Sequence, residues 1–192
     1  MPIVRKEEIL DSWSVLIGGA QGRAGEIFDN TNNFIRQTKV PNVGIQRKAV
    51  APGILRGLFG TKRDFLIVTE TENSRLRPYQ MFIGARDYGS NLDVYWYLLY
   101  RPSFRERLLA FFLFIPILNL LILPFAFVSG LATMAKEKRG GLGLDFFDEQ
   151  DLRAYVTNAH HCLLEVVDKL MTDLHQDPSR IDRKSRGFLG IS

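Results

Sequence analysis

The chain has 192 residues, 46% of them hydrophobic, and its 25 Lys and Arg against 21 Asp and Glu give a formal charge of +4. This composition suits one folded domain. It excludes a disordered chain, a collagen-like repeat and a disulfide-stapled scaffold, because apolar content is ample, glycine shows no period and Cys162 is the one cysteine. With one cysteine and no glycosylation sequon, we expect a reducing, cytoplasm-facing location.

The first part of the chain shows helical spacing of apolar side chains. Residues 3–17 are expected to form a short helix and residues 23–37 a second one. Glycines at 18, 19, 22 and 25 favour a turn between the two helices. Glycines before a helix also occur in phosphate-binding loops, but the required Gly-Lys-Ser/Thr is absent here, so no cofactor is expected.

The pattern then changes to one typical of strands. Short runs rich in β-branched and aromatic residues alternate with Gly, Pro, Asn and Ser clusters. An antiparallel meander covered by an N-terminal helix is the simplest arrangement, so residues 1–103 are interpreted as a cytoplasmic α+β domain with a four-stranded, mainly antiparallel sheet. The expected strands are Val43–Val50, Asp64–Glu70, Tyr79–Arg86 and Leu92–Tyr100.

Residues 108–135 form an uncharged stretch of 28 consecutive positions. Apolar runs longer than about 18 residues predict a membrane segment, so residues 104–139 are interpreted as membrane-inserted. Pro116 and Pro124, with Asn119 between them, predict a bend in this segment, because each proline removes a backbone donor.

The flanks of this stretch bear on its orientation. Three basic residues stand on each side, and such a balance favours a helical hairpin that enters and leaves one leaflet from the cytoplasmic face. A single kinked span and a buried hairpin in a soluble protein stay open as alternatives. The residues expected to contact lipid headgroups are Tyr95, Tyr97, Arg101, Arg105, Arg107, Lys136, Lys138 and Arg139.

The last part of the chain is predicted to be a joint, a helix and a tail. Residues 140–147 form a Gly-rich joint, and the segment 148–176 contains a long amphipathic helix over Asp148–Leu174. Its wide apolar stripe suits packing on a sheet or in a bundle, and a seam with a partner helix is the alternative. Residues 177–192 form a basic tail. Its expected partner-docking residues are Arg183, Lys184, Arg186, Phe188, Leu189 and Ile191.

Candidate chemistry is weak. His160, His161 and Cys162 are adjacent, so their side chains point in different directions from a helix, and His161 with Glu165 supplies two ligands where zinc takes three or four. No metal site and no catalytic residue is therefore expected. The basic residues around the sheet lack the signature of an RNA-binding sheet, so nucleic acid is not an expected partner.

We therefore expect an α+β fold with a membrane-inserted hairpin and a long C-terminal amphipathic helix. Its expected role is non-enzymatic anchoring, scaffolding or assembly at the cytoplasmic face of a membrane, with both termini cytoplasmic. The expected partners are the lipid bilayer and another protein or a second copy, bound through the last helix or the tail. The alternatives are a membrane-perturbing or pore-forming effector with a ligand-sensing sheet, and a membrane-anchored enzyme.

Overall fold

The computed structural model describes residues 9–50, 62–101 and 144–191. The chain divides into two compact units, of which the first combines Met1–Arg101 with Asp151–Ser192 and the second is Pro102–Gln150. The first unit contains the sheet and is the one described below.

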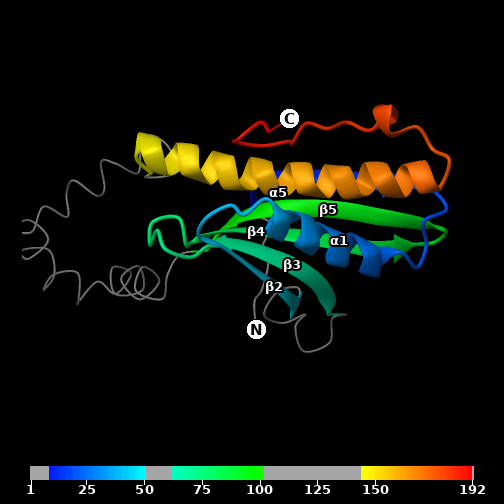
Figure 1. Cartoon of the computed structure of the whole chain (residues 1–192), viewed down its shortest axis with the longest axis horizontal. Coiled ribbons are helices and arrows are strands. Elements are labelled where there is room, and N and C mark those ends of the chain that lie inside the picture. Colours follow the sequence, from blue (N-terminus) through cyan, green and yellow to red (C-terminus); the bar gives the residue numbers. More distant parts are fainter. Residues whose placement is uncertain (1–8, 51–61, 102–143, 192) are drawn as a thin grey trace, which may run out of the picture. The chain divides into compact units, whose positions relative to one another are not determined.

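The first unit is built on five strands, which form one antiparallel sheet (Figure 1). In space they lie in the order first, fifth, fourth, third, second, so the first strand of the chain pairs with the last and the second forms the opposite edge. Consecutive neighbours from the second to the fifth strand make a meander. The strands are β1 (Ile9–Ile17), β2 (Val43–Val50), β3 (Arg63–Glu70), β4 (Tyr79–Tyr88) and β5 (Asn91–Tyr100).

β1 shows that the helix predicted over residues 3–17 was wrong, and with it the count of four strands. Trp13 and Ile17 are buried while Ser14 is exposed, which is the two-residue period of a strand. Trp13 lies opposite Trp96 of β5 in the register. An apolar pattern this short is compatible with both the helical and the strand period, and pairing with β5 makes the segment a strand. The other four strands coincide with the predicted ranges to within two residues at each end.

The predicted fold class also contained a membrane-inserted hairpin, and this part needs correction. Among the described residues no helix is both long enough and apolar enough to cross a membrane. The predicted hairpin, residues 104–139, lies outside the described ranges. The described fold is therefore α+β, with a five-stranded antiparallel sheet and two α-helices, and neither a transmembrane nor a monotopic hairpin is part of it.

The two α-helices, α1 (Ala24–Gln37) and α5 (Phe146–Asp173), pack beside each other on the sheet (Figure 1). α1 covers β3 and β4. α5 reaches β5 through a hydrogen bond from Trp96 Nε1 to His160, so it packs on the sheet of its own chain, the first of the two arrangements considered for it. The apolar residues that α5 buries are Leu152, Tyr155, Val156, Ala159, Cys162, Leu163, Leu164, Val166, Val167, Leu170 and Met171.

The opposite face of the sheet carries an aromatic cluster. Side chains alternate along a strand, so Tyr95 and Leu99 point away from the face that Trp96 presents to α5. The Tyr95 ring lies against Gly84, where an added Cβ would stand 2.6 Å from the ring. The buried members of the cluster are Val50, Phe65, Ile67, Phe82, Tyr95 and Leu99.

Candidate functional site

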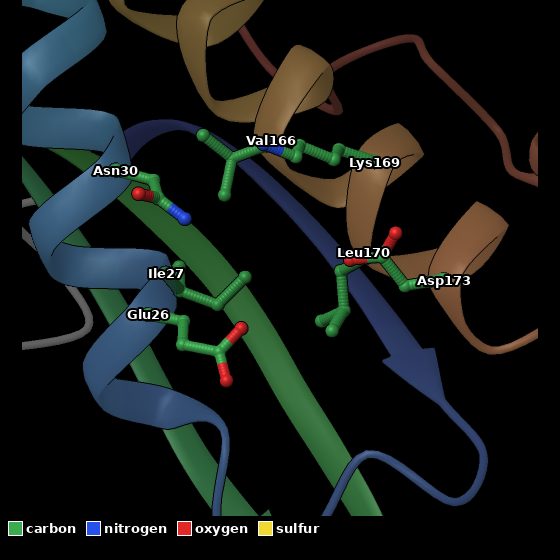
Figure 2. Close-up of a pocket in the computed structure, with 7 residues that line it drawn as sticks. All are labelled: Glu26, Ile27, Asn30, Val166, Lys169, Leu170 and Asp173. Carbon is green, nitrogen blue, oxygen red and sulfur yellow. The ribbon is translucent and has the colours of Figure 1, made fainter.

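A groove of about 150 Å³ runs between α1 and α5 (Figure 2). Ile27, Val166 and Leu170 point into it and are almost fully buried, so its floor is apolar. Its rim is polar and is formed by Glu26, Asn30, Lys169 and Asp173.

Ion pairing neutralises much of the charge on this rim. Arg23 donates two hydrogen bonds to the Glu26 carboxylate, at 2.9 and 2.6 Å, and lies 3.6 Å from Asp173. The bond from Arg23 lowers the pKa of Glu26 below its ordinary value. Pockets for drug-sized ligands span about 300–1,000 Å³, so this groove is too small for a nucleotide or a comparable cofactor.

A second polar cluster lies at the free edge of β1, where residues 182–191 return along the strand. We call this segment the C-terminal strap. The amide of Arg186 donates to the Ser12 carbonyl at 2.7 Å, and the amide of Phe188 donates to the Leu10 carbonyl at 3.0 Å. The strap residue number increases from 186 to 188 while that of its β1 partner decreases from 12 to 10, so the strap runs antiparallel to β1. The strap thereby covers a sheet edge that would otherwise expose unpaired backbone groups.

Asp11 fixes the strap from inside the fold. This carboxylate is fully buried and sits at a register shift in β1. It accepts hydrogen bonds from the amide of Ser12 at 2.7 Å, from Ser185 Oγ at 3.0 Å and from the amide of Leu189 at 3.0 Å. A buried carboxylate is stable when such donors replace its lost hydration, so β1 and the strap form one bonded structure.

His160 connects α5, β5 and the strap. Trp96 Nε1 donates to His160 Nδ1 at 2.9 Å, and His160 Nε2 lies 2.8 Å from the carbonyl of Arg183. Because a carbonyl only accepts, Nε2 carries the proton, and because the indole only donates, Nδ1 does not. The imidazole is therefore neutral. Burial lowers its pKa below the ordinary value, which agrees with this assignment.

The start of the strap has two further attachments. Trp13 Nε1 donates to the Asp182 carbonyl at 2.6 Å. One guanidinium nitrogen of Arg183, Nη2, donates to both oxygens of the Asp168 carboxylate, at 2.9 and 2.8 Å. Together with the Asp11 and His160 clusters, these contacts hold the strap along most of its length.

The tail residues expected to dock a partner thus lie in or on the strap. Leu189 and Ile191 are 2% and 4% exposed, so these two side chains are buried within this chain. Phe188 is 49% exposed, and Lys184 and Arg186 are exposed beside it. Arg183 is exposed as well, and docking of a partner by the six tail residues stays a prediction.

The expected headgroup-contact residues lie in different places. Tyr95 is buried and Tyr97 half-buried within the aromatic face, and burial raises the pKa of both phenols. The Arg101 guanidinium lies 4.6 Å from the centre of the Phe82 ring. Headgroup contact by these residues stays a prediction. The expected bend and headgroup residues outside the described ranges are Arg105, Arg107, Pro116, Asn119, Pro124, Lys136, Lys138 and Arg139.

His160, His161 and Cys162 lie next to one another on α5. Within the described ranges, no group of three or more His, Cys, Asp or Glu side chains is placed to hold a metal ion. Cys162 is buried, and burial raises the pKa of its thiol, so the thiolate needed for nucleophilic attack is disfavoured. His160 is occupied by Trp96 and the strap, a function that its sequence neighbours do not reveal.

The chain leaves and re-enters the first unit at one end of the sheet. Tyr79 lies opposite Tyr100 in the register, and the amide of Arg101 donates to the Pro78 carbonyl at 2.7 Å. On the return, the Tyr155 hydroxyl donates to the Tyr79 carbonyl at 2.9 Å. Residues 102–150 are thus an insertion whose two ends are joined to neighbouring points of one folded unit.

Removal of the Tyr155 hydroxyl is expected to loosen this junction. Tyr155→Phe keeps the buried ring but leaves the Tyr79 carbonyl without this donor, so we expect a loss of about 1 kcal/mol in the free energy of unfolding. Urea titration followed by circular dichroism measures it. Tyr88→Phe, at a position 64% exposed, is the matched control and should leave the midpoint unchanged. Equal midpoints for both variants would show that the bond adds nothing.

Comparison with protein-family models, curated proteins and solved structures finds no match for this chain.

Proposed function

We propose that this chain is a non-enzymatic anchoring or scaffolding protein that attaches to the cytoplasmic face of a membrane and presents its sheet domain there for assembly. The observation that carries the proposal is the position of the uncharged stretch. Residues 108–135 lie inside the insertion 102–150, and both ends of that insertion join the first unit around Tyr79. Binding of the uncharged stretch to a surface therefore does not require the first unit to come apart.

Attachment would draw on two sources of affinity. Transfer of apolar side chains from water contributes about 25 cal/mol per Å² buried. Basic residues next to an anionic surface add about 1 kcal/mol each, and three flank the stretch on either side. This mode of attachment does not depend on a helix that crosses the bilayer.

The packing of the first unit also indicates whether the segments before and after the insertion lie on the same side of the membrane. β1 comes before the insertion, whereas α5 and the strap come largely after it, yet Trp13 and Trp96 bond to Asp182 and His160. Segments packed this closely lie on one side of any membrane. This supports a location of both halves on the same side, which the proposal takes to be the cytoplasmic one, and it argues against a single kinked span that would separate them.

Extraction of membranes with alkaline carbonate tests the proposal. The full chain is expected to stay in the membrane pellet, and a variant lacking residues 108–135 is expected to appear in the supernatant. A variant of full length with Leu113, Ile117 and Leu121 changed to Arg is the matched control for loss of length, and it should also be released. Release of the unaltered chain by carbonate would refute the attachment.

A further inference from the structure

The strap carries all its recognition elements within ten residues. Its main chain bonds to Leu10 and Ser12, its Ser185 hydroxyl and Leu189 amide bond to Asp11, and the carbonyls of Asp182 and Arg183 accept from Trp13 and His160. These partners belong to β1 and α5, which both precede the strap in the chain. A strap of the same sequence from another molecule would make the same contacts.

Gly187 makes the close approach to β1 possible. A Cβ built at this position would stand 2.5 Å from Asp11 Cα and 2.5 Å from the Leu10 carbonyl oxygen, and both are backbone atoms that cannot rotate away. Glycine is therefore required at the one strap position that lies against Leu10 and Asp11. The edge thus selects a segment with glycine at this point, followed by apolar side chains at the positions of Leu189 and Ile191.

The connection between α5 and the strap has few anchors. It reverses direction at His175, which has φ of +58°, and continues through the short 3-10 helix η2 (Pro178–Arg180). The hydrogen bonds of η2 are local, for example from the Ser179 amide to Asp177, and Gln176 Nε2 bonds to the Gly18 carbonyl at 2.7 Å. A change of a few backbone angles here would redirect the strap without disturbing α5.

From these features we propose that the edge of β1 docks the strap of a second copy, so that two copies exchange straps reciprocally. Exchange of an identical element is a low-cost route to a symmetric dimer, because each contact made within one chain is remade between chains. The inference rests on the assembly role proposed above and gives it a partner, namely the chain itself.

Cysteine pairing between differently marked copies tests the exchange. One full-length variant carries Leu10→Cys and another carries Phe188→Cys, two positions joined by a main-chain hydrogen bond of 3.0 Å. After mixing and mild oxidation, we expect a disulfide-linked species of twice the chain mass of 21.9 kDa. A chain with both substitutions is the control for geometry, and each variant oxidised alone controls for other pairings.

A second measurement keeps the inference testable if that cysteine pair cannot bond. Light scattering over a range of concentrations should show dimers for the unaltered chain and at least a tenfold weaker dimerisation for Gly187→Ala, which blocks docking. Gly25→Ala is the matched control, because no atom lies within 4 Å of its Cβ position.

The two assays can also overturn the inference. An internal disulfide in the doubly substituted chain without any linked species in the mixture would do so, as would equal association of the unaltered chain and Gly187→Ala. Membrane retention in carbonate would be untouched by either result, so the exchange and the attachment fail separately.

Discussion

Replacement of Asp11 by alanine is expected to lower the free energy of unfolding by about 3 kcal/mol and to release the strap. The carboxylate is fully buried, and its removal leaves three donors, on Ser12, Ser185 and Leu189, without their acceptor. Unsatisfied buried donors cost about 1–3 kcal/mol each, and partial rehydration at the sheet edge limits the sum. Urea unfolding at neutral pH measures the loss.

Release of the strap has its own readout. Trypsin cleaves after Arg and Lys, and the strap offers such sites at Arg183, Lys184 and Arg186. In Asp11→Ala, cleavage there should accelerate more than in the matched control Asp29→Ala, which removes an exposed carboxylate paired with Arg47 at 3.5 Å and should cost about 0.5 kcal/mol or less. Equal cleavage of the two variants would show that Asp11 does not hold the strap.

Strong local patterns account for the elements that could be predicted from the sequence. In β3, each residue from Phe65 to Val68 is apolar, which is typical of a strand inside the sheet with both faces covered. β3 does lie inside the sheet, because it pairs with β2 on one edge and with β4 on the other. α1 has a similarly clear signal, with Ile27, Thr31 and Ile35 on one face at helical spacing. Both elements follow from residues that are close together in the chain.

β1 was misassigned because its deciding contacts are distant. Its partner β5 begins at Asn91, and neither a helix nor a strand is excluded by the pattern around Trp13 alone. One signal was available: Asp11 occupies the same face as Trp13 and Ile17, so a strand there would place a carboxylate in an apolar row. Such a residue needs buried donors, and this indicates a structural or binding role.

The roles of His160 and of the tail could not be read from the sequence for the same reason. His160 receives its hydrogen bond from a residue 64 positions away, and Asp11 binds Leu189 across 178 positions. The tail has the composition of a solvated segment, with Arg183, Lys184 and Arg186 close together. Its apolar residues find their place only after β1 has become an edge of the sheet.

Replacement of His160 by alanine is expected to lower the free energy of unfolding by about 3 kcal/mol. The change leaves a cavity beneath α5, deprives the Trp96 indole of its acceptor and removes the donor that binds the Arg183 carbonyl. His161→Ala, at the exposed position next to it, is the matched control and should cost less than 1 kcal/mol. Thermal or urea unfolding of both variants measures the difference, and similar losses would contradict a special role for His160.

The same site predicts how stability depends on pH. Burial lowers the pKa of His160 in the folded state, so the unfolded chain binds more protons as pH falls through about 6.5, the ordinary value for histidine. The contribution of His160 is therefore complete above that pH and is lost as pH falls toward the folded pKa. Protonation would also place a hydrogen on Nδ1, which could then no longer accept the hydrogen bond from the Trp96 indole N–H.

The charged groups that face His160 are Asp11 from β1, His161 from its own helix and Arg183 from the strap, and burial outweighs all of them. His160→Gln retains a donor in place of Nε2 and does not titrate, so its unfolding midpoint should fall less between pH 7.5 and pH 5 than that of the unaltered chain. His161→Gln should keep the full dependence. An identical pH profile for His160→Gln and the unaltered chain would assign the dependence to other groups, and the neutral imidazole would then hold the strap without sensing protons.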